Sequence, residues 1–101
     1  NYVGYCTSKG AVVMLTKQLA CEWAKFNIQV NAIAPTVIGT PLTAHIMGDP
    51  ELSKTMKSRI LLGRWGYPDD LIGAIVYFAC DASNFVTGQV LFIDGGVTSW
   101  T

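Results

Sequence analysis

The sequence predicts an α/β fold in which a helix, a strand, a long loop, a second helix and a second strand follow one another. Three observations predict it: an uninterrupted amphipathic pattern near the amino end, a short apolar run on either side of the long loop, and a Pro-Asp-Asp helix start between them. Two strands do not form a stable parallel sheet alone, so we expect further strands outside these 101 residues.

The first predicted helix spans Gly4 to Lys25, where no proline interrupts the recurring apolar residues. Its apolar arc is wide, which predicts burial on two sides, by a sheet and by another helix. Asn27 is the expected turn out of this helix. The run from Ile28 to Ile33, ending at Pro35, predicts the first buried strand.

Residues 36–66 form a long connection punctuated by glycine and proline. Within it, Asp49 is a good helix N-cap and Pro50 suits the first helical position. The fourfold spacing of apolar residues favours a short helix there, with Leu52, Met56 and Ile60 on one face. Long connections of this kind are often lids or binding loops.

The second predicted helix begins at Pro68, because proline suits the first turn and carboxylates suit the positive end of the helix dipole. It continues from Leu71 to Cys80. A second buried strand over Val90 to Ile93 follows, closed by the tight turn Asp94-Gly95-Gly96. That turn lacks the pattern of a phosphate-binding loop.

Composition narrows the class of protein. Half of the residues are apolar, so we expect apolar surface that either stays exposed or is covered from outside the chain. A net charge of zero without a basic cluster argues against nucleic acid as a partner, and no apolar run nears the ~20 residues of a membrane span. Three cysteines without CxxC spacing favour a cytoplasmic location.

Tyr5 and Lys9 are four residues apart at the start of the first predicted helix, so their side chains lie on one face about one turn apart. An adjacent ammonium and a helix amino terminus both favour the phenolate, which suits acid/base chemistry. For an isolated pair, however, a packed tyrosine beside a solvated lysine is the commoner arrangement.

The surrounding residues favour the chemical interpretation. The stretch Tyr5-Cys6-Thr7-Ser8-Lys9 resembles the YxxSK segment of the short-chain dehydrogenases/reductases. Further segments resemble this family in its usual order and spacing along the whole chain: Leu15-Thr16-Lys17, Leu19-Ala20-Cys21-Glu22, Val30-Asn31-Ala32-Ile33-Ala34-Pro35, Thr40-Pro41, Gly63-Arg64-Trp65-Gly66, Pro68-Asp69-Asp70-Leu71, Thr87-Gly88 and Asp94-Gly95-Gly96.

The resemblance implies that residues 1–101 are the carboxyl-terminal portion of a single NAD(P)-binding Rossmann-fold domain, with a doubly wound parallel sheet and the amino-terminal half absent. It implies a catalytic tyrosine at Tyr5, which exchanges a proton with the substrate oxygen, and a lysine at Lys9 that holds the nicotinamide ribose. The family's usual serine and asparagine lie upstream of this sequence. Without the glycine-rich turn, the chain alone should neither bind NAD(P)H nor turn over substrate, and should aggregate or bind a hydrophobic dye.

Ligands of open α/β sheets bind beyond the carboxyl ends of the strands, which for the first strand means beyond Pro35. The resemblance assigns NAD or NADP to the backbone of Ile38 and the hydroxyl of Thr40. Without it, these are an ordinary loop aliphatic and a turn hydroxyl. Most members have glycine at Thr36, so the conformation there is in question, although some sugar and polyol reductases carry Pro-Thr. The cofactor-binding set is Tyr5, Lys9, Pro35, Thr36, Ile38 and Thr40.

The expected reaction interconverts a secondary alcohol and a ketone of a small molecule. A sugar, sugar acid or polyol, as in gluconate 5-dehydrogenase-like members, is the expected substrate; a 3-oxoacyl carrier-protein reductase is the alternative. A non-catalytic scaffold is a further alternative, because the family's dimers and tetramers use the same helices and last strand.

Other conspicuous side chains have ordinary interpretations. His45 is alone in the long loop, so we expect it to be solvated, and we predict no metal site. Ser8 should face away from the Tyr5–Lys9 pair. The tryptophans are expected in core, lid or subunit contacts, at Trp23, Trp65 and Trp100.

Overall fold

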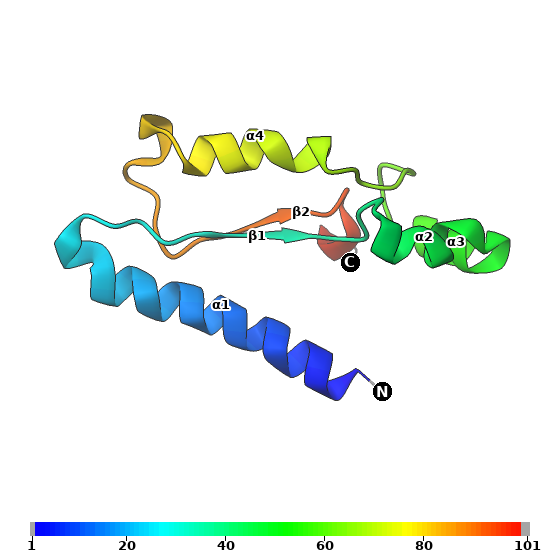
Figure 1. The fold of residues 1–101 in the computed structure, drawn as a ribbon, viewed down its shortest axis with the longest axis horizontal. Coiled ribbons are helices and arrows are strands. Elements are labelled where there is room, and N and C mark those ends of the chain that lie inside the picture. Colours follow the sequence, from blue (N-terminus) through cyan, green and yellow to red (C-terminus); the bar gives the residue numbers. More distant parts are fainter. Residues whose placement is uncertain (1, 100–101) are drawn as a thin grey trace. The chain divides into compact units, whose positions relative to one another are not determined.

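The computed structural model of the protein describes residues 2–99 (Figure 1). The element order is the predicted one, so the α/β fold is confirmed. The helices and strands are α1 (Val3–Trp23), β1 (Ala32–Pro35), α2 (Ala44–Gly48), α3 (Pro50–Lys57), α4 (Asp69–Phe78) and β2 (Val90–Ile93), with short 3-10 helices at Ala24–Phe26, Pro41–Thr43, Asp81–Ser83 and Val97–Ser99.

Within the described residues, β1 and β2 form a two-stranded parallel sheet. The prediction that the first strand begins near Ile28 is wrong, because β1 begins at Ala32. The Asn31 side chain explains the late start. It donates to the carbonyl of Val86 at 2.8 Å and accepts from the backbone N–H of Gln89 at 3.0 Å, where a ladder would use backbone groups. The predicted burial of both strands is also wrong within this chain, since their residues are half-exposed or exposed.

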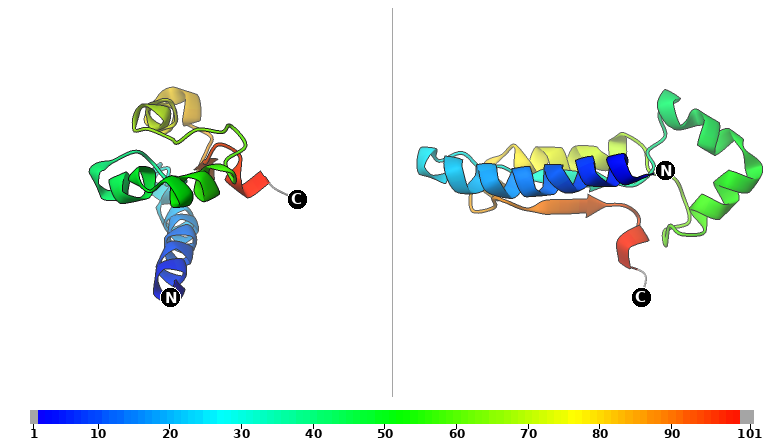
Figure 2. Two further views of the ribbon diagram at one scale, coloured as in Figure 1. Left: turned by 90° about the vertical axis from the view of Figure 1, so that its right-hand side faces the viewer. Right: turned by 90° about the horizontal axis from the view of Figure 1, so that it is seen from below.

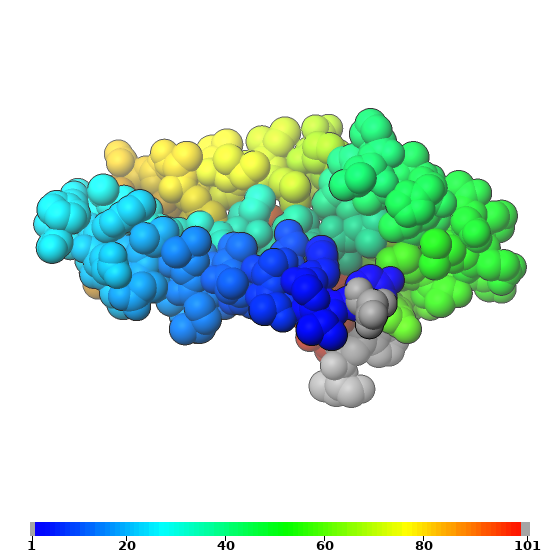
Figure 3. Space-filling view, turned by 60° about the horizontal axis from the view of Figure 1, so that its bottom comes forward, coloured from blue at the N-terminus to red at the C-terminus, as the bar shows by residue number. Residues whose placement is uncertain are grey.

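Helix α1 is regular but almost uncovered. It ends in a 3-10 turn at Asn27, whose φ of 58° is left-handed, so the predicted turn is confirmed. Of the residues from Val3 to Trp23, Thr16 and Ala20 are buried, and the side chains of α1 stand open on the face shown in Figure 3. The predicted burial on two sides is therefore wrong here, because residues 2–99 do not supply the layers that would cover this helix.

The long connection contains the predicted short helix. In α3 the Asp49 carboxylate caps the amino end by accepting from the Leu52 N–H at 2.9 Å. The helix ends at Lys57, so Ile60 lies beyond it, although Ile60 is buried. The sequence did not predict α2. Figure 2 shows that α2 and α3, both within the long connection, run at an angle to each other.

Beyond the connection, α4 starts at Asp69, one residue after the predicted Pro68, and ends at Phe78, two residues before the predicted Cys80. The turn after β2 is confirmed, with a positive φ at Gly95 (63°) and at Gly96 (92°). Asp94 closes this turn by accepting hydrogen bonds from Gly96 and Thr98. The Thr98 hydroxyl is the largest cause that lowers the pKa of Asp94.

The chain divides into two compact units, and each is described by itself below. One unit holds the residues up to Ile33 together with Val76–Leu91, and the other holds Ala34–Ile75 with the residues from Phe92 on. The three cysteines are free thiols. No helix in residues 2–99 combines the length and the apolar content needed to cross a membrane.

Candidate functional site

The structure brings Tyr5 and Lys9 together on the first turns of α1. The Lys9 Nζ lies 5.5 Å from the centroid of the Tyr5 ring, over its face. Tyr5 is 63% exposed, so its hydroxyl is open to a reactant. The first backbone N–H groups of a helix have no intrahelical acceptor, and Tyr5 stands in this first turn, which begins at Val3. A phenol and an ammonium therefore lie together on exposed turns at the amino end of α1.

The Ser8 hydroxyl is hydrogen-bonded to the helix backbone. It donates to the Tyr5 carbonyl at 2.8 Å, an i to i−3 bond along the helix. Because this bond uses the proton of the Ser8 hydroxyl, Ser8 does not donate it to the Tyr5 phenol.

The remaining candidate residues lie in the other unit, around the loop that follows β1. Pro35 is the last residue of β1 and is exposed, whereas the residues of the β1 loop (residues 36–40) are half-buried. Asn27 is the one non-glycine residue with positive φ in the described part of the chain, so Thr36 does not need the backbone freedom of glycine. Threonine at this position is therefore compatible with an unstrained loop.

The peptide group between Ile38 and Gly39 is held at both of its polar atoms. Its N–H, on Gly39, donates to the Gly66 carbonyl at 2.8 Å, and its carbonyl, on Ile38, accepts from the Thr43 hydroxyl at 2.5 Å. A Cβ on Gly39 would lie 2.7 Å from the Tyr67 ring, so glycine permits this close approach. The Ile38 N–H is not used by the bridge to Gly66.

Thr43 is a residue of this loop network that the sequence did not single out. Its hydroxyl oxygen accepts from the Thr40 N–H at 3.0 Å and lies 3.3 Å from the Thr40 hydroxyl. The two threonines form a reciprocal capping box around the 3-10 helix Pro41–Thr43. The signal available in the sequence was a threonine three residues after Thr40, which is the N3 position of a capping box.

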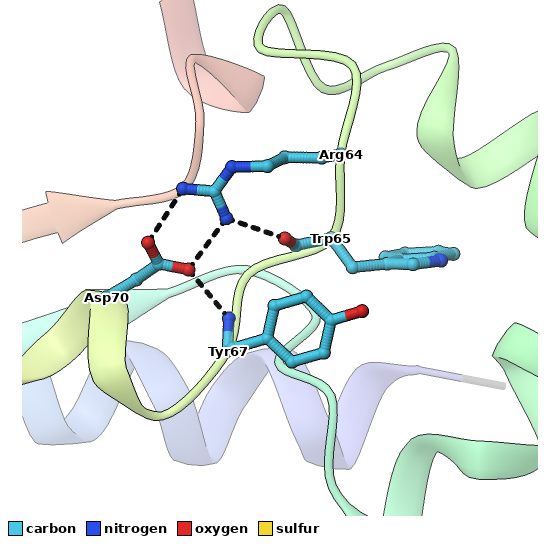
Figure 4. A network of polar contacts seen from close by, with 4 residues as sticks. All are labelled: Arg64, Trp65, Tyr67 and Asp70. Carbon is cyan, nitrogen blue, oxygen red and sulfur yellow. Dashed lines mark hydrogen bonds and ion pairs between the residues drawn. The ribbon is translucent and has the colours of Figure 1, made fainter.

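A second unpredicted network fixes the segment that pairs with the β1 loop (Figure 4). The Arg64 guanidinium binds both carboxylate oxygens of Asp70, at 2.7 and 2.8 Å, and also donates to the Trp65 carbonyl. Asp70 accepts from the Tyr67 N–H at 2.8 Å, which holds the start of α4. The hydrogen bond from Arg64 is the main cause that holds the pKa of Asp70 well below its usual range, and the same pair raises the pKa of Arg64.

Beyond the carboxyl ends of the strands in this unit lies a cavity of about 130 Å³. Its wall is partly apolar, with Ile60, Trp65 and Ile93, and partly polar, with Arg64 and Asp70 already bound to each other. Thr36 of the β1 loop also lines it. The cavity therefore adjoins the loop that the sequence assigns to cofactor binding.

The candidate residues thus form two groups in different units of the chain. Tyr5 and Lys9 make one group, and the residues following β1 make the other, each with its own internal contacts. His45 is exposed, and its Nδ1 lies 3.0 Å from the Leu42 carbonyl. In residues 2–99 no three His, Cys, Asp or Glu side chains gather in a metal-binding arrangement. Trp100, expected in a contact, lies outside the described residues.

Two proteins similar to this chain are named as dehydrogenases. The chain is 48% identical over 92 residues to 2-dehydro-3-deoxy-D-gluconate 5-dehydrogenase from Dickeya dadantii. The aligned region covers 91% of this chain and 36% of the relative. It is 44% identical over 98 residues to NAD-dependent glycerol dehydrogenase from Listeria innocua, covering 97% of this chain and 38% of the relative.

The same likeness holds in three dimensions. The crystal structure of a gluconate 5-dehydrogenase from Burkholderia cenocepacia, in complex with NADP and tartrate, superposes with a TM-score of 0.93 at 43% identity. The match covers 98% of this chain and 39% of that one, so the chain spans little more than a third of the length of these proteins. The fold is that of part of a Rossmann-type enzyme.

A family model described as enoyl-(acyl carrier protein) reductase matches residues 1–98, nearly the whole sequence. This match and the similarity to the dehydrogenases confirm the resemblance found in the sequence motifs. The chain belongs to the short-chain dehydrogenase/reductase family.

Proposed function

We propose that the whole protein is an NAD(P)-dependent oxidoreductase that interconverts a secondary alcohol and a ketone, with residues 1–101 as the carboxyl-terminal portion of its single dinucleotide-binding domain. The observation that carries the proposal is the Tyr5–Lys9 pair at the amino end of α1, with the ammonium 5.5 Å from the phenol ring. The names of the similar dehydrogenases support the same reaction class.

In this proposal Tyr5 moves the proton. During ketone reduction the phenol gives its proton to the substrate oxygen, and during alcohol oxidation the phenolate takes it back. Lys9 stabilises the phenolate by its positive charge and binds the ribose hydroxyls of the cofactor. A bound nicotinamide supplies or accepts the hydride at the neighbouring carbon.

The β1 loop fits the other end of the nicotinamide. An N–H that the bridge leaves unused, at Ile38, suits an amide oxygen, and the half-buried hydroxyl of Thr40 suits a carboxamide or a pyrophosphate oxygen. Pro35 and Thr36 would complete the wall beside the ring. NAD and NADP both remain candidates, since one relative is named NAD-dependent and one similar structure holds NADP.

A sugar acid, sugar or polyol is the proposed substrate class. The support is the similarity to a 2-dehydro-3-deoxy-D-gluconate 5-dehydrogenase and to a gluconate 5-dehydrogenase. A 3-oxoacyl carrier-protein reductase is the second candidate, favoured by the description of the matching family model, which names a carrier-protein substrate. Turnover of the whole protein with gluconate-type acids and with a 3-oxoacyl thioester, compared at equal cofactor concentration, separates the two.

The exposed apolar side chains of α1 need cover from outside residues 2–99. In this proposal the rest of the domain and a subunit contact both supply that cover, so the whole protein is a dimer or tetramer. The same exposed surface is the observation that favours a purely structural role for the chain. The free cysteines support a reducing compartment, which keeps the cytoplasm as the proposed location.

The deciding experiment is Tyr5→Phe in the whole protein. We expect kcat to fall by about 10²- to 10⁴-fold, because the ring remains while the exchangeable proton is lost. Tyr2→Phe is the matched control: it removes a phenol hydroxyl from the same end of the chain, one residue before α1. Turnover by a folded Tyr5→Phe variant equal to that of Tyr2→Phe would refute the proton-transfer role and favour the structural one.

A further inference from the structure

We infer that Thr43 is a positioning residue for cofactor binding, which it serves by fixing the Ile38–Gly39 peptide and the Thr40 backbone in the β1 loop. The inference rests on the proposed function, because it takes Ile38 and Thr40 as the loop groups that meet the nicotinamide end of the cofactor. Thr43 itself need not touch the cofactor.

The Thr43 hydroxyl has a single proton to donate. Two carbonyls lie in range, that of Ile38 at 2.5 Å and that of Thr40 at 3.1 Å. The shorter contact takes the proton, since O–H to O hydrogen bonds weaken as they lengthen beyond about 2.8 Å. The hydroxyl oxygen then accepts from the Thr40 N–H at 3.0 Å.

These bonds join the middle and the end of the β1 loop, Ile38 and Thr40, through one side-chain atom. The chain of donors runs from the Thr40 N–H to the Thr43 hydroxyl and from there to the Ile38 carbonyl. Because each bond polarises the next, such a series holds its members more firmly than separate pairs do. Both flanks of Gly39 are thereby fixed.

The Ile38–Gly39 peptide is hydrogen-bonded at both of its polar atoms. Its oxygen accepts from the Thr43 hydroxyl, and its N–H donates to the Gly66 carbonyl at 2.8 Å. A planar peptide bound at both polar atoms cannot rotate about the flanking bonds without losing one of the two partners. The Ile38 N–H belongs to the preceding peptide, but Ile38 also pairs with Gly66 in a parallel bridge, so the backbone on both sides of Ile38 is set before any ligand arrives.

The consequence for binding is energetic. A loop that is already ordered loses less conformational entropy when a ligand binds, so preorganisation raises affinity without a new contact. Losing the hydroxyl also leaves the half-buried Ile38 carbonyl and Thr40 N–H without this partner. Removing the Thr43 hydroxyl should therefore weaken cofactor binding while leaving the chemical step largely intact.

The test compares Thr43→Val, which keeps the shape of the side chain but removes the hydroxyl, with Thr43→Ser, which keeps the hydroxyl. We expect the dissociation constant of NAD(P)H, titrated by its fluorescence on the whole protein, to rise about three- to tenfold in Thr43→Val and to stay within about twofold in Thr43→Ser. Thr55→Val, on the exposed side of α3, is the matched control for the same exchange away from the loop.

Hydrogen exchange on the cofactor-free protein supplies a readout that does not depend on activity. The Thr40 amide should exchange faster in Thr43→Val than in the other variants, because it loses its acceptor. Wild-type NAD(P)H affinity in a folded Thr43→Val variant overturns the inference, whether or not exchange changes. Failure of the unmodified protein to bind NAD(P)H, or full turnover by Tyr5→Phe, identifies instead a failure of the proposed function.

Discussion

Helix α1 and the segment from Ile60 to Asp70 hold their shapes in opposite ways. In α1 the backbone is regular and bonded along its length, yet Thr16 and Ala20 are the buried residues between Val3 and Trp23. The segment from 60 to 70 has no helix or strand before α4, but it buries Ile60 and Trp65 and carries the Arg64–Asp70 ion pair. Local hydrogen bonds maintain the first region, and tertiary contacts maintain the second.

Regular secondary structure and packing are therefore separate contributions to order. A helix gains one backbone bond per residue once it is nucleated, whether or not a partner covers it, although most helical stability in proteins comes from packing. An irregular segment has no such ladder, so its shape depends on each specific contact. The two regions should therefore respond differently to the same kind of substitution.

The largest expected difference is between two tryptophans. Trp65 is 7% exposed and Trp23 is 39% exposed. We expect Trp65→Ala to lower the free energy of unfolding by about 3–5 kcal/mol, because it leaves a cavity, whereas Trp23→Ala should cost about 1 kcal/mol. Urea unfolding of the whole protein, followed by circular dichroism, measures both. Equal costs would mean that packing around Trp65 does not maintain its segment.

Glycine substitutions should change stability with opposite signs in the two regions. A Cβ on Gly95, whose φ is 63°, would lie 2.6 Å from Cγ2 of Ile60, so Gly95→Ala should destabilise by about 2 kcal/mol. In α1 a Cβ on Gly10 meets nothing within 4 Å, so Gly10→Ala should stabilise by about 0.5–1 kcal/mol. Thermal melts of both variants test the signs, and a destabilised Gly10→Ala chain would contradict this account.

The smallest expected effect is the response to acid. Hydrogen bonds from Arg64 and Thr98 lower the pKa values of Asp70 and Asp94 in the folded chain, so the unfolded chain binds protons more readily. The stability from these carboxylates is therefore fully present above the ordinary aspartate pKa of about 3.9 and is lost as pH falls through the folded values. Urea unfolding between pH 6 and pH 2 measures this loss.

Two variants and salt sharpen the acid test. Asp94→Asn should flatten the pH dependence of the unfolding free energy below pH ~4. Asp70→Asn should also flatten it, and in high salt its effect should be smaller than that of Asp94→Asn. The Arg64 side chain is 56% exposed and that of Asp70 is 31% exposed, so water and salt screen this pair. An unchanged slope in Asp94→Asn would show that the turn after β2 does not depend on that carboxylate.

The sequence by itself determined the elements whose causes are local. The long helix, the Asp49-capped helix, the start of α4 and the Gly95-Gly96 turn follow from apolar spacing, capping residues and glycine at positive φ. The one-turn spacing of Tyr5 and Lys9 is likewise a property of any helix at that position.

Contacts between residues far apart in the chain were decided by the tertiary structure. The start of β1 depends on Asn31 meeting Val86 and Gln89, more than fifty residues away, and no local pattern announces such a meeting. The orientation of the Ile38–Gly39 peptide depends on hydrogen bonds to Gly66 as well as to Thr43. The exposure of α1 depends on which layers lie over it, because burial of an apolar face is a property of its neighbours and not of its own residues.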